Sequence, residues 1–288
     1  MHYKFHKVYI EITNICGLEC TFCPTKNIKS NTMDLNFFEN IIKQLPKYTK
    51  DIAFHIFGDP LTLSNLKDYL DLSLKYNLSV HITTTGYYLN KFDLNLFLHK
   101  AIKQINFSLN SYNKNEMNIS LNEYIKPMLN LCELKLKNKI HNFINFRLWN
   151  IDKQNSEDRF NNKVFSILSK KFNIDLSNIN FEKPIRVENQ ILINFDNYFK
   201  WPSLKDTTIS NGYCHGLTSQ IGILSSGIVV PCCLDSFGVI NLGNLKKNSL
   251  EDILQSKKSI EIVDGFKNNI AKEELCQKCT FKNRFIKN

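Results

Sequence analysis

Short apolar runs rich in β-branched residues alternate with helical segments along roughly the first 185 residues of the chain. We expect strands at 8–13, 52–57, 80–85, 105–109 and 143–149, a weaker sixth at 179–185, and helices within 35–45, 66–76, 94–102, 124–136 and 164–172. Strands that alternate with helices in this way form βαβ units and a parallel sheet. Right-handed crossovers wind six such units into an open sheet or a partial barrel, whose chemistry gathers at the carboxyl ends of the strands.

The pattern changes after about residue 190. The run 221–230, interrupted at 225–227, is typical of a hairpin, and a short helix is expected at 250–256. We therefore predict two domains, residues 1–190 and residues 191–288. The second is small and rich in cysteine, and its own core is too thin to fold without a bound cluster or metal.

The cysteine content indicates metal or cluster binding rather than disulfides. The chain has nine cysteines in 288 residues, in two groups with Cys132 alone between them. The start of the chain has no apolar segment typical of a secretory signal, and no run approaches the roughly 18 to 20 apolar residues of a membrane span. We therefore expect a cytoplasmic protein with reduced thiols and no membrane partner.

The charge allows an anionic partner but does not favour one. The net charge of +10 comes from 37 Lys plus Arg against 27 Asp plus Glu, and a basic balance can attract nucleic acid. The lysines are scattered and form no long block, as expected of a chain rich in Lys, Asn and Ile throughout. Nucleic acid is therefore not the favoured partner.

Three cysteines lie on one short loop directly after the first expected strand. Cys16, Cys20 and Cys23 have the spacing CxxxCxxC. Three thiolates on one loop can bind three irons of a 4Fe–4S cluster and leave the fourth iron open to a small molecule, whereas typical cluster sites use four cysteines. The alternative is a zinc site or three unrelated buried thiols, but zinc usually takes four ligands and no further Cys or His lies nearby.

This motif, with the aromatic Phe22 before its last cysteine, resembles that of the radical S-adenosylmethionine (SAM) superfamily. The resemblance implies a TIM-like partial (β/α)6 barrel and a SAM-binding 4Fe–4S cluster on the three cysteines. It implies that the open iron takes the amino and carboxylate groups of SAM, and that an electron from the cluster cleaves SAM to a 5′-deoxyadenosyl radical. A reducing partner such as flavodoxin or ferredoxin is implied as well.

Further segments at the ends of expected strands match positions that contact SAM in this family. Gly58-Asp59-Pro60 resembles a Gly-Glu-Pro motif, with Asp in place of the usual Glu, and Thr84-Thr85-Gly86 resembles a Thr-Asn-Gly motif. Other polar residues end the fourth and fifth expected strands. The resemblance therefore implies a cofactor-binding set that consists of Phe22, Gly58, Asp59, Pro60, Thr85, Ser108, Asn110 and Arg147. The alternative for each residue is an ordinary turn or a polar strand end.

The later cysteines resemble those of the SPASM domain of peptide-modifying radical SAM enzymes. Cys214 is followed by twelve residues, Gly227, four residues and Cys232, and the pair Cys276 and Cys279 comes much later. Because no cysteine follows, the match is to the shortened Twitch form, which implies one auxiliary 4Fe–4S cluster on these four cysteines. The adjacent Cys233 is the alternative to Cys232, since neighbouring side chains on an extended segment point to opposite faces. A structural zinc ribbon is the alternative for the whole set.

The leading hypothesis is a radical SAM oxidoreductase that abstracts hydrogen from a peptide or from a small molecule such as a sugar or cyclitol. The auxiliary cluster would assist oxidation or substrate binding, and Asp235 would accept a proton, with a turn or capping role as its alternative. The first strand begins close to the start, without the leader-binding extension of many peptide maturases, which favours a small molecule or a peptide recognised without that extension. Radical modification of RNA or a nucleotide, and a non-enzymatic zinc- or cluster-bearing binding module, are the other hypotheses.

Overall fold

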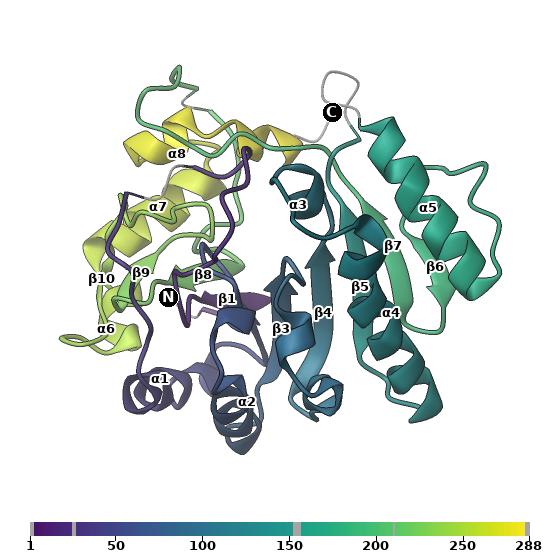
Figure 1. Cartoon of the computed structure of the whole chain (residues 1–288). Helices are drawn as coiled ribbons and strands as arrows, with labels where there is room; N and C mark the ends of the chain where they lie inside the picture. Colours follow the sequence, from purple (N-terminus) through teal and green to yellow (C-terminus); the bar gives the residue numbers. More distant parts are fainter. Residues whose placement is uncertain (1–2, 25–26, 152–156, 210, 286–288) are drawn as a thin grey trace.

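The computed structural model describes residues 3–24, 27–151, 157–209 and 211–285. Within these residues ten strands form one sheet, in the order β10-β9-β8-β1-β2-β3-β4-β5-β7-β6 (Figure 1). The strands are β1 Lys7–Ile10, β2 Asp51–Phe54, β3 Ser79–Thr84, β4 Ile102–Ser108, β5 Phe143–Leu148, β6 Ile185–Glu188, β7 Ile191–Phe195, β8 Gln220–Ile223, β9 Ile228–Val230 and β10 Gly243–Asn244. The helices are α1 Leu35–Ile42, α2 Leu66–Lys75, α3 Asn110–Asn113, α4 Leu121–Lys137, α5 Asp158–Phe172, α6 Leu250–Leu254, α7 Lys257–Lys267 and α8 Glu274–Lys278.

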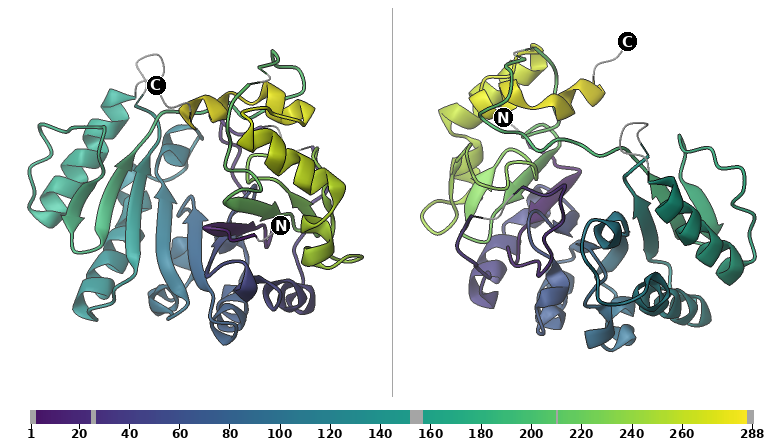
Figure 2. Two further views of the ribbon diagram at one scale, coloured as in Figure 1. Left: turned by 180° about the vertical axis from the view of Figure 1, so that it is seen from behind. Right: turned by 45° about the horizontal axis from the view of Figure 1, so that its top comes forward.

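The central strands β1, β2, β3, β4, β5 and β7 are parallel neighbours, as the alternating pattern predicts. Helices α1, α2, α4 and α5 cover the outer face of the curved sheet, and the inner face turns towards the C-terminal segments (Figures 1 and 2). On β1, Val8 and Ile10 are fully buried against the helices, whereas Lys7 and Tyr9 are half-buried on the inner face. This alternation puts polar side chains inside the partial barrel.

The prediction for the sixth strand is wrong in its position. The strand that continues the parallel sheet is β7, and β6 pairs with it as an antiparallel edge strand. A tight turn at Asn189, which has a φ of 43°, joins the two strands into a hairpin, and Asn tolerates this left-handed conformation. Strand β7 therefore begins just after the predicted boundary between the two domains, which lies between residues 190 and 191. That domain boundary stays a prediction.

Two further predictions of secondary structure have clear outcomes. The expected helix at 94–102 is a short 3₁₀ helix, Leu94–Leu98, which begins at the side-chain cap of Asp93. The hairpin expected at 221–230 is confirmed, because β8 and β9 are antiparallel around Gly227, whose φ is 91°. No described helix is long and apolar enough to cross a membrane.

The hairpin of the C-terminal segment is part of the main sheet. Strand β8 pairs in parallel with β1, from Lys7 opposite Gln220 to Ile10 opposite Ile223. Just beyond β1, the buried Glu11 accepts hydrogen bonds from the backbone N–H and the hydroxyl of Ser225, at 3.1 and 2.8 Å. The second unit thus extends the sheet at its β1 edge, a pairing that the sequence pattern did not predict.

Candidate functional site

The loop after β1 holds the first three cysteines against neighbouring loops. Gly17 has a φ of 73°, and a Cβ atom there would lie 1.9 Å from the Tyr88 hydroxyl, so a glycine is needed. Asn115 donates its side-chain N–H to the Cys20 Sγ at 3.0 Å and accepts the Glu19 backbone N–H at 3.0 Å. Asn115 therefore orients the loop, and no sequence motif pointed to this residue.

The Cys20 thiol lies in surroundings that favour the thiolate. A hydrogen bond from Cys23 lowers the pKa of Cys20 to about 6, with further contributions from Asn115 and Ser111 and an opposing effect of burial. A thiolate is the form that binds iron. The donor set of this loop therefore fits a cluster site.

A first cavity opens beside this loop at the carboxyl ends of the strands. The three cysteines line it together with seven of the eight residues expected to bind the cofactor; Pro60 does not line it and instead begins the 3₁₀ helix Pro60–Thr62. The seven are Phe22, Gly58, Asp59, Thr85, Ser108, Asn110 and Arg147. The structure thus brings the residues together, and their contacts with SAM stay a prediction.

The Asp59 carboxylate joins two of the predicted motifs. It accepts hydrogen bonds from the Leu61 backbone N–H, the Thr84 hydroxyl, and both the backbone N–H and the hydroxyl of Thr85, all at 2.8 to 2.9 Å. A Cβ atom on Gly58 would lie 2.1 Å from the Thr13 carbonyl oxygen, so the loop can pass only with glycine. With four donors on its carboxylate, Asp59 holds the loops after β2 and β3 together, which favours a positioning role for this side chain.

A second cavity contains the later cysteines. Cys214, Cys232, Cys233, Cys276 and Cys279 line it, together with inward-facing residues of β1 to β5. Burial raises the pKa of the Cys232 thiol, and the nearby Cys214, Cys233 and Cys276 raise it further. Cys233 instead hydrogen-bonds to the Tyr9 hydroxyl. This arrangement supports Cys232 as the fourth member of the set, and the ligand assignment itself stays a prediction.

Lys282 is a buried cation beside these thiols, and no sequence motif pointed to it. Its side chain is 1% exposed, and its ammonium donates to the backbone oxygens of Cys276, Gln277 and Cys279 at 3.0, 3.2 and 3.0 Å. Burial lowers the pKa of Lys282, whereas Cys279, Cys276 and Cys214 oppose the shift. The ammonium satisfies the carbonyls at the end of α8 and so fixes the turn that carries the CxxC pair.

Replacing Lys282 with Met should destabilise the C-terminal unit by about 2 kcal/mol, because three buried carbonyls lose their donor. We expect a lower free energy of unfolding in urea and a lower iron content after anaerobic reconstitution. Lys267→Met is the matched control, since the Lys267 side chain is 59% exposed and its ammonium forms a surface ion pair with Asp264. Equal stability and equal iron content of the two variants would contradict this role of Lys282.

Asp235, the predicted proton acceptor, lies in the wall of the second cavity but is engaged by the backbone. Its two carboxylate oxygens accept the N–H groups of Val239 and Ile240 at 2.8 and 2.7 Å, and the residue is 2% exposed. Burial raises the pKa of Asp235, and these N–H donors oppose the shift. The geometry favours the turn-capping alternative, and the catalytic role stays a prediction.

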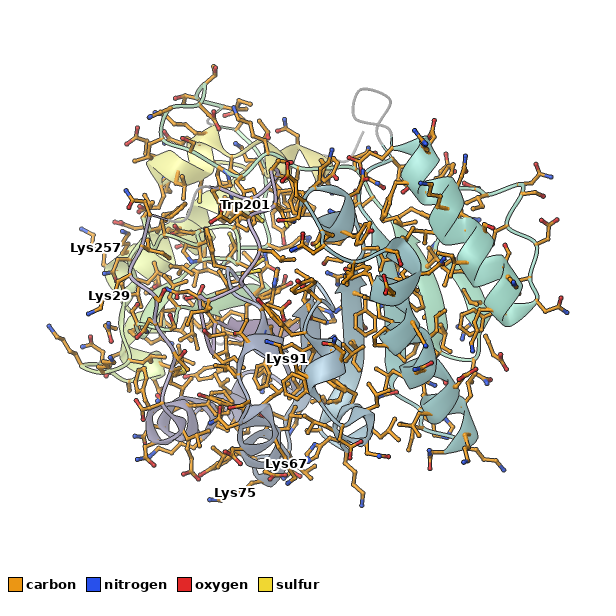
Figure 3. The ribbon with its side chains drawn as sticks, viewed as in Figure 1. Lys29, Lys67, Lys75, Lys91, Trp201 and Lys257 are labelled. Atoms are coloured by element: carbon orange, nitrogen blue, oxygen red, sulfur yellow. The ribbon has the colours of Figure 1, made fainter. Side chains whose placement is uncertain are left out.

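The two cavities share one wall. His55, Thr83, Arg147, Trp149, Phe199 and Trp201 line both. Phe199 lies between Trp149 and Trp201, with ring centroids 6.3 and 5.4 Å apart, and Figure 3 shows Trp201 between the strand ends and the C-terminal helices. The aromatic segment 198–201 follows β7, and because no strand was predicted at β7, the segment was not recognised as part of the site.

His55 in this shared wall is a neutral imidazole. Burial, with the nearby charges of Arg147 and Lys7, lowers the pKa of His55 to about 3. The side chain keeps some exposed surface because it faces the cavity. It is therefore available to a bound molecule as a neutral hydrogen-bonding group.

Neither of the two sets of cysteines has its thiols arranged around a single point. Within the described residues, no group of three or more His, Cys, Asp and Glu side chains is placed to hold one metal ion. A zinc ion needs its ligands about 2.0 to 2.3 Å from one centre. The thiol spacing and the two cysteine-lined cavities are the features of the chain that fit iron–sulfur clusters.

Two family models match the chain. The radical SAM superfamily matches residues 10–160, and SPASM, an iron–sulfur cluster-binding domain, matches residues 214–280. The first match covers more than half of the chain, and the second includes all five C-terminal cysteines. Together they agree with the two resemblances found in the sequence, and they imply a SAM-binding 4Fe–4S cluster and an auxiliary cluster as cofactors.

One curated relative and several solved structures are similar to the chain. The S-adenosyl-L-methionine-dependent 2-deoxy-scyllo-inosamine dehydrogenase of Niallia circulans is 26% identical over 77 residues, which are 25% of this chain and 31% of that protein. The matched segment thus spans less than a third of the relative's length.

The solved structures share the fold over almost the whole chain. BtrN in complex with AdoMet and 2-DOIA has a TM-score of 0.63 at 16% identity and covers 97% of this chain and 94% of its own. The enzyme anSMEcpe with bound AdoMet and a Cp18Cys peptide has a TM-score of 0.58 at 17% identity and covers 96% and 86%. At these identities the likeness shows the fold, a partial barrel with a C-terminal cysteine-rich unit.

Proposed function

This chain belongs to the radical SAM superfamily, and on that premise we propose that the enzyme oxidises a small molecule held between its two cysteine-lined cavities. The observation that carries this proposal is the shared wall of six residues. A molecule against that wall lies beside the predicted SAM site on one side and beside the predicted auxiliary cluster on the other. Hydrogen abstraction and loss of the remaining electron can therefore take place on one bound substrate.

The residues proposed to hold the cofactors come from two separate parts of the chain. The SAM-binding cluster is assigned to Cys16, Cys20 and Cys23, and the auxiliary cluster to Cys214, Cys232, Cys276 and Cys279. When bound and reduced, the first cluster supplies the electron that cleaves SAM to a 5′-deoxyadenosyl radical. We propose that a reducing partner such as flavodoxin or ferredoxin delivers that electron.

The chain's own contribution is to position the reactants and to exclude water. The loops after β2 and β3, joined through Asp59, form one side of the predicted SAM site. Phe199 and Trp201 form an aromatic boundary of the shared cavity, and an apolar boundary protects a reactive intermediate from solvent. His55 offers a neutral imidazole to a hydroxyl group of the substrate.

The similarity to the curated relative supports a small molecule rather than a peptide as the substrate of this chain. That relative is a dehydrogenase of 2-deoxy-scyllo-inosamine, and BtrN, whose structure contains 2-DOIA, is matched over 94% of its chain. A peptide substrate is the second candidate, supported by the fold that the chain shares with anSMEcpe, which has a bound peptide in its structure. The inward-facing cavity of the partial barrel can accept a small molecule or a single side chain of a peptide.

The surface gives little support to an RNA substrate. In Figure 3 the labelled lysines come from separate elements and are spread over the view, with Lys29 and Lys257 at the left, Lys67 at the bottom and Lys91 near the centre. Nucleic-acid binding proteins usually gather such charges on one face. The positive charge of this chain is therefore better explained by a dispersed basic composition.

Anaerobically reconstituted enzyme should produce 5′-deoxyadenosine from SAM and a reductant. It should convert the correct substrate to a product whose mass is lower by that of two hydrogens. Mass spectrometry of both compounds, with fractionated small-molecule extracts as the substrate source, tests the proposal. A protein with both clusters that makes no 5′-deoxyadenosine would exclude the proposed reaction. A peptide as the only compound that changes in mass would favour the second candidate.

A further inference from the structure

Two cationic side chains from different strands face the second cavity. Lys7 lies on the inner face of β1, two residues before Tyr9, and Arg147 lies on the inner face of β5. The Arg147 guanidinium is 4.7 Å from the ring centroid of Trp149. Each cation influences the surroundings of the same cavity, since the charges of both lower the pKa of His55.

Neither cation has a carboxylate partner among the described residues. The two acidic residues in the cavity wall, Asp196 and Asp235, are engaged elsewhere. Asp196 pairs with Arg284 at 2.9 Å, and Asp235 accepts two backbone N–H groups. Asp51 and Asp196 still attract Lys7 and Arg147 from a distance, but neither cation forms a direct ion pair among the described residues. Buried charges are costly unless a partner balances them.

We propose that Lys7 and Arg147 form a subsite for an anionic group of the substrate, a carboxylate or a phosphate. This inference rests on the proposed function and narrows its substrate to an anionic small molecule. A guanidinium binds a carboxylate or phosphate in a bidentate manner, and an ammonium adds a point charge. The subsite sets this chain apart from the relative whose named substrate is an amine, because an ammonium group would be repelled here.

The auxiliary thiols are the competing source of negative charge. Lys282 is the cation held next to Cys276 and Cys279, and its ammonium binds the carbonyls of their turn. Lys7 and Arg147 instead belong to barrel strands. Arg147 also lines the first cavity, and the proposed subsite replaces the cofactor-binding role that the resemblance implied for it. If the thiolates alone balanced these two cations, no added anion would bind, so a binding experiment separates the two explanations.

The test uses a matched series of hexoses on the reconstituted enzyme with SAM and no reductant. Glucose is neutral, glucosamine is cationic, glucuronate carries a carboxylate and glucose 6-phosphate carries a phosphate; inorganic phosphate is added as a fifth probe. Calorimetry gives the dissociation constants. Both tryptophans of the chain, Trp149 and Trp201, line the cavity, so a change in tryptophan fluorescence places the binding there.

We expect at least one anionic probe to bind about ten-fold or more tightly than glucose and glucosamine, as charge-assisted hydrogen bonds predict. Lys7→Met and Arg147→Met should remove that preference, whereas Arg147→Lys should keep part of it. Lys257→Met, which removes the same charge from a side chain that is 89% exposed, should have no effect.

Three results would overturn the subsite. The first is that glucose or glucosamine binds as tightly as the anionic probes, and the second is that none of the three anionic probes binds. The third is that the Lys7→Met and Arg147→Met variants keep the preference for anions. Because no reductant is present, these results do not depend on turnover. An enzyme that binds the anionic probes but makes no 5′-deoxyadenosine would support the subsite and contradict the proposed reaction. An enzyme that makes 5′-deoxyadenosine but does not bind the anionic probes would support the reaction and contradict the subsite.

Discussion

Replacing Cys20 with Ala should reduce formation of 5′-deoxyadenosine from SAM to the background without enzyme. Cys20 is buried at the centre of the CxxxCxxC loop, and Asn115 and Cys23 hold its thiol in the form that binds metal. With two thiolates left, the loop cannot retain its cluster, and the iron content should fall by about four per chain from a total of about eight. Quantification of iron and of 5′-deoxyadenosine after anaerobic reconstitution tests both expectations.

Cys132→Ala is the matched control for this experiment. Cys132 is fully buried in α4, and burial raises its pKa far above that of a free thiol. Loss of this side chain should leave the iron content and the yield of 5′-deoxyadenosine unchanged apart from a modest loss of stability. Full activity of the Cys20 variant would remove the basis for assigning the first cluster to this loop.

Replacing Cys232 with Ala should remove about four irons per chain, whereas replacing its neighbour Cys233 should remove none. Burial raises the pKa of Cys232, and the nearby Cys214 and Cys276 raise it further, so Cys232 lies close to other thiols of the set. Cys233 instead hydrogen-bonds to the Tyr9 hydroxyl. Since cluster binding contributes folding free energy to a small unit, the Cys232 variant should also unfold at a lower temperature.

Cys232 and Cys233 are adjacent in the sequence and their side chains point in different directions, so the two variants test which thiol binds the cluster. The Cys232 variant should still cleave SAM, because the first cluster lies on a separate loop, and should lose substrate turnover. Iron loss in the Cys233 variant alone would reverse the assignment. Iron loss in neither would contradict an auxiliary cluster that depends on this segment.

The features that could be predicted from the sequence are those that depend on residues close to one another along the chain. The spacing of Cys16, Cys20 and Cys23 and the strand–helix alternation are local patterns, and they led to the fold class and to the first cysteine loop. The sixth strand was misplaced because two short β-rich runs, 185–188 and 191–195, form a hairpin, and periodicity alone cannot show which of them continues the sheet.

Residues that act across the fold could not be predicted in this way. Asn115 reaches Cys20 over 95 positions of sequence, and Lys282 binds carbonyls of a turn whose shape is set by tertiary packing. The role of Asp59 also became visible only when β3 placed Thr84 and Thr85 beside it. Each of these contacts depends on which loops meet, and a single sequence carries no signal for that.

The pairing of β8 with β1 has a consequence for how the enzyme matures. Strand β1 leads into the first cysteine loop, and β8 leads through a hairpin to Cys232, so both ends of this strand pair lead to predicted cofactor ligands. Insertion of either cluster orders the shared strand pair and lowers the entropic cost of inserting the other. Each cluster should therefore bind more tightly when the other is in place, and the cluster that a Cys20 or Cys232 variant keeps should be bound less tightly than in the unsubstituted chain.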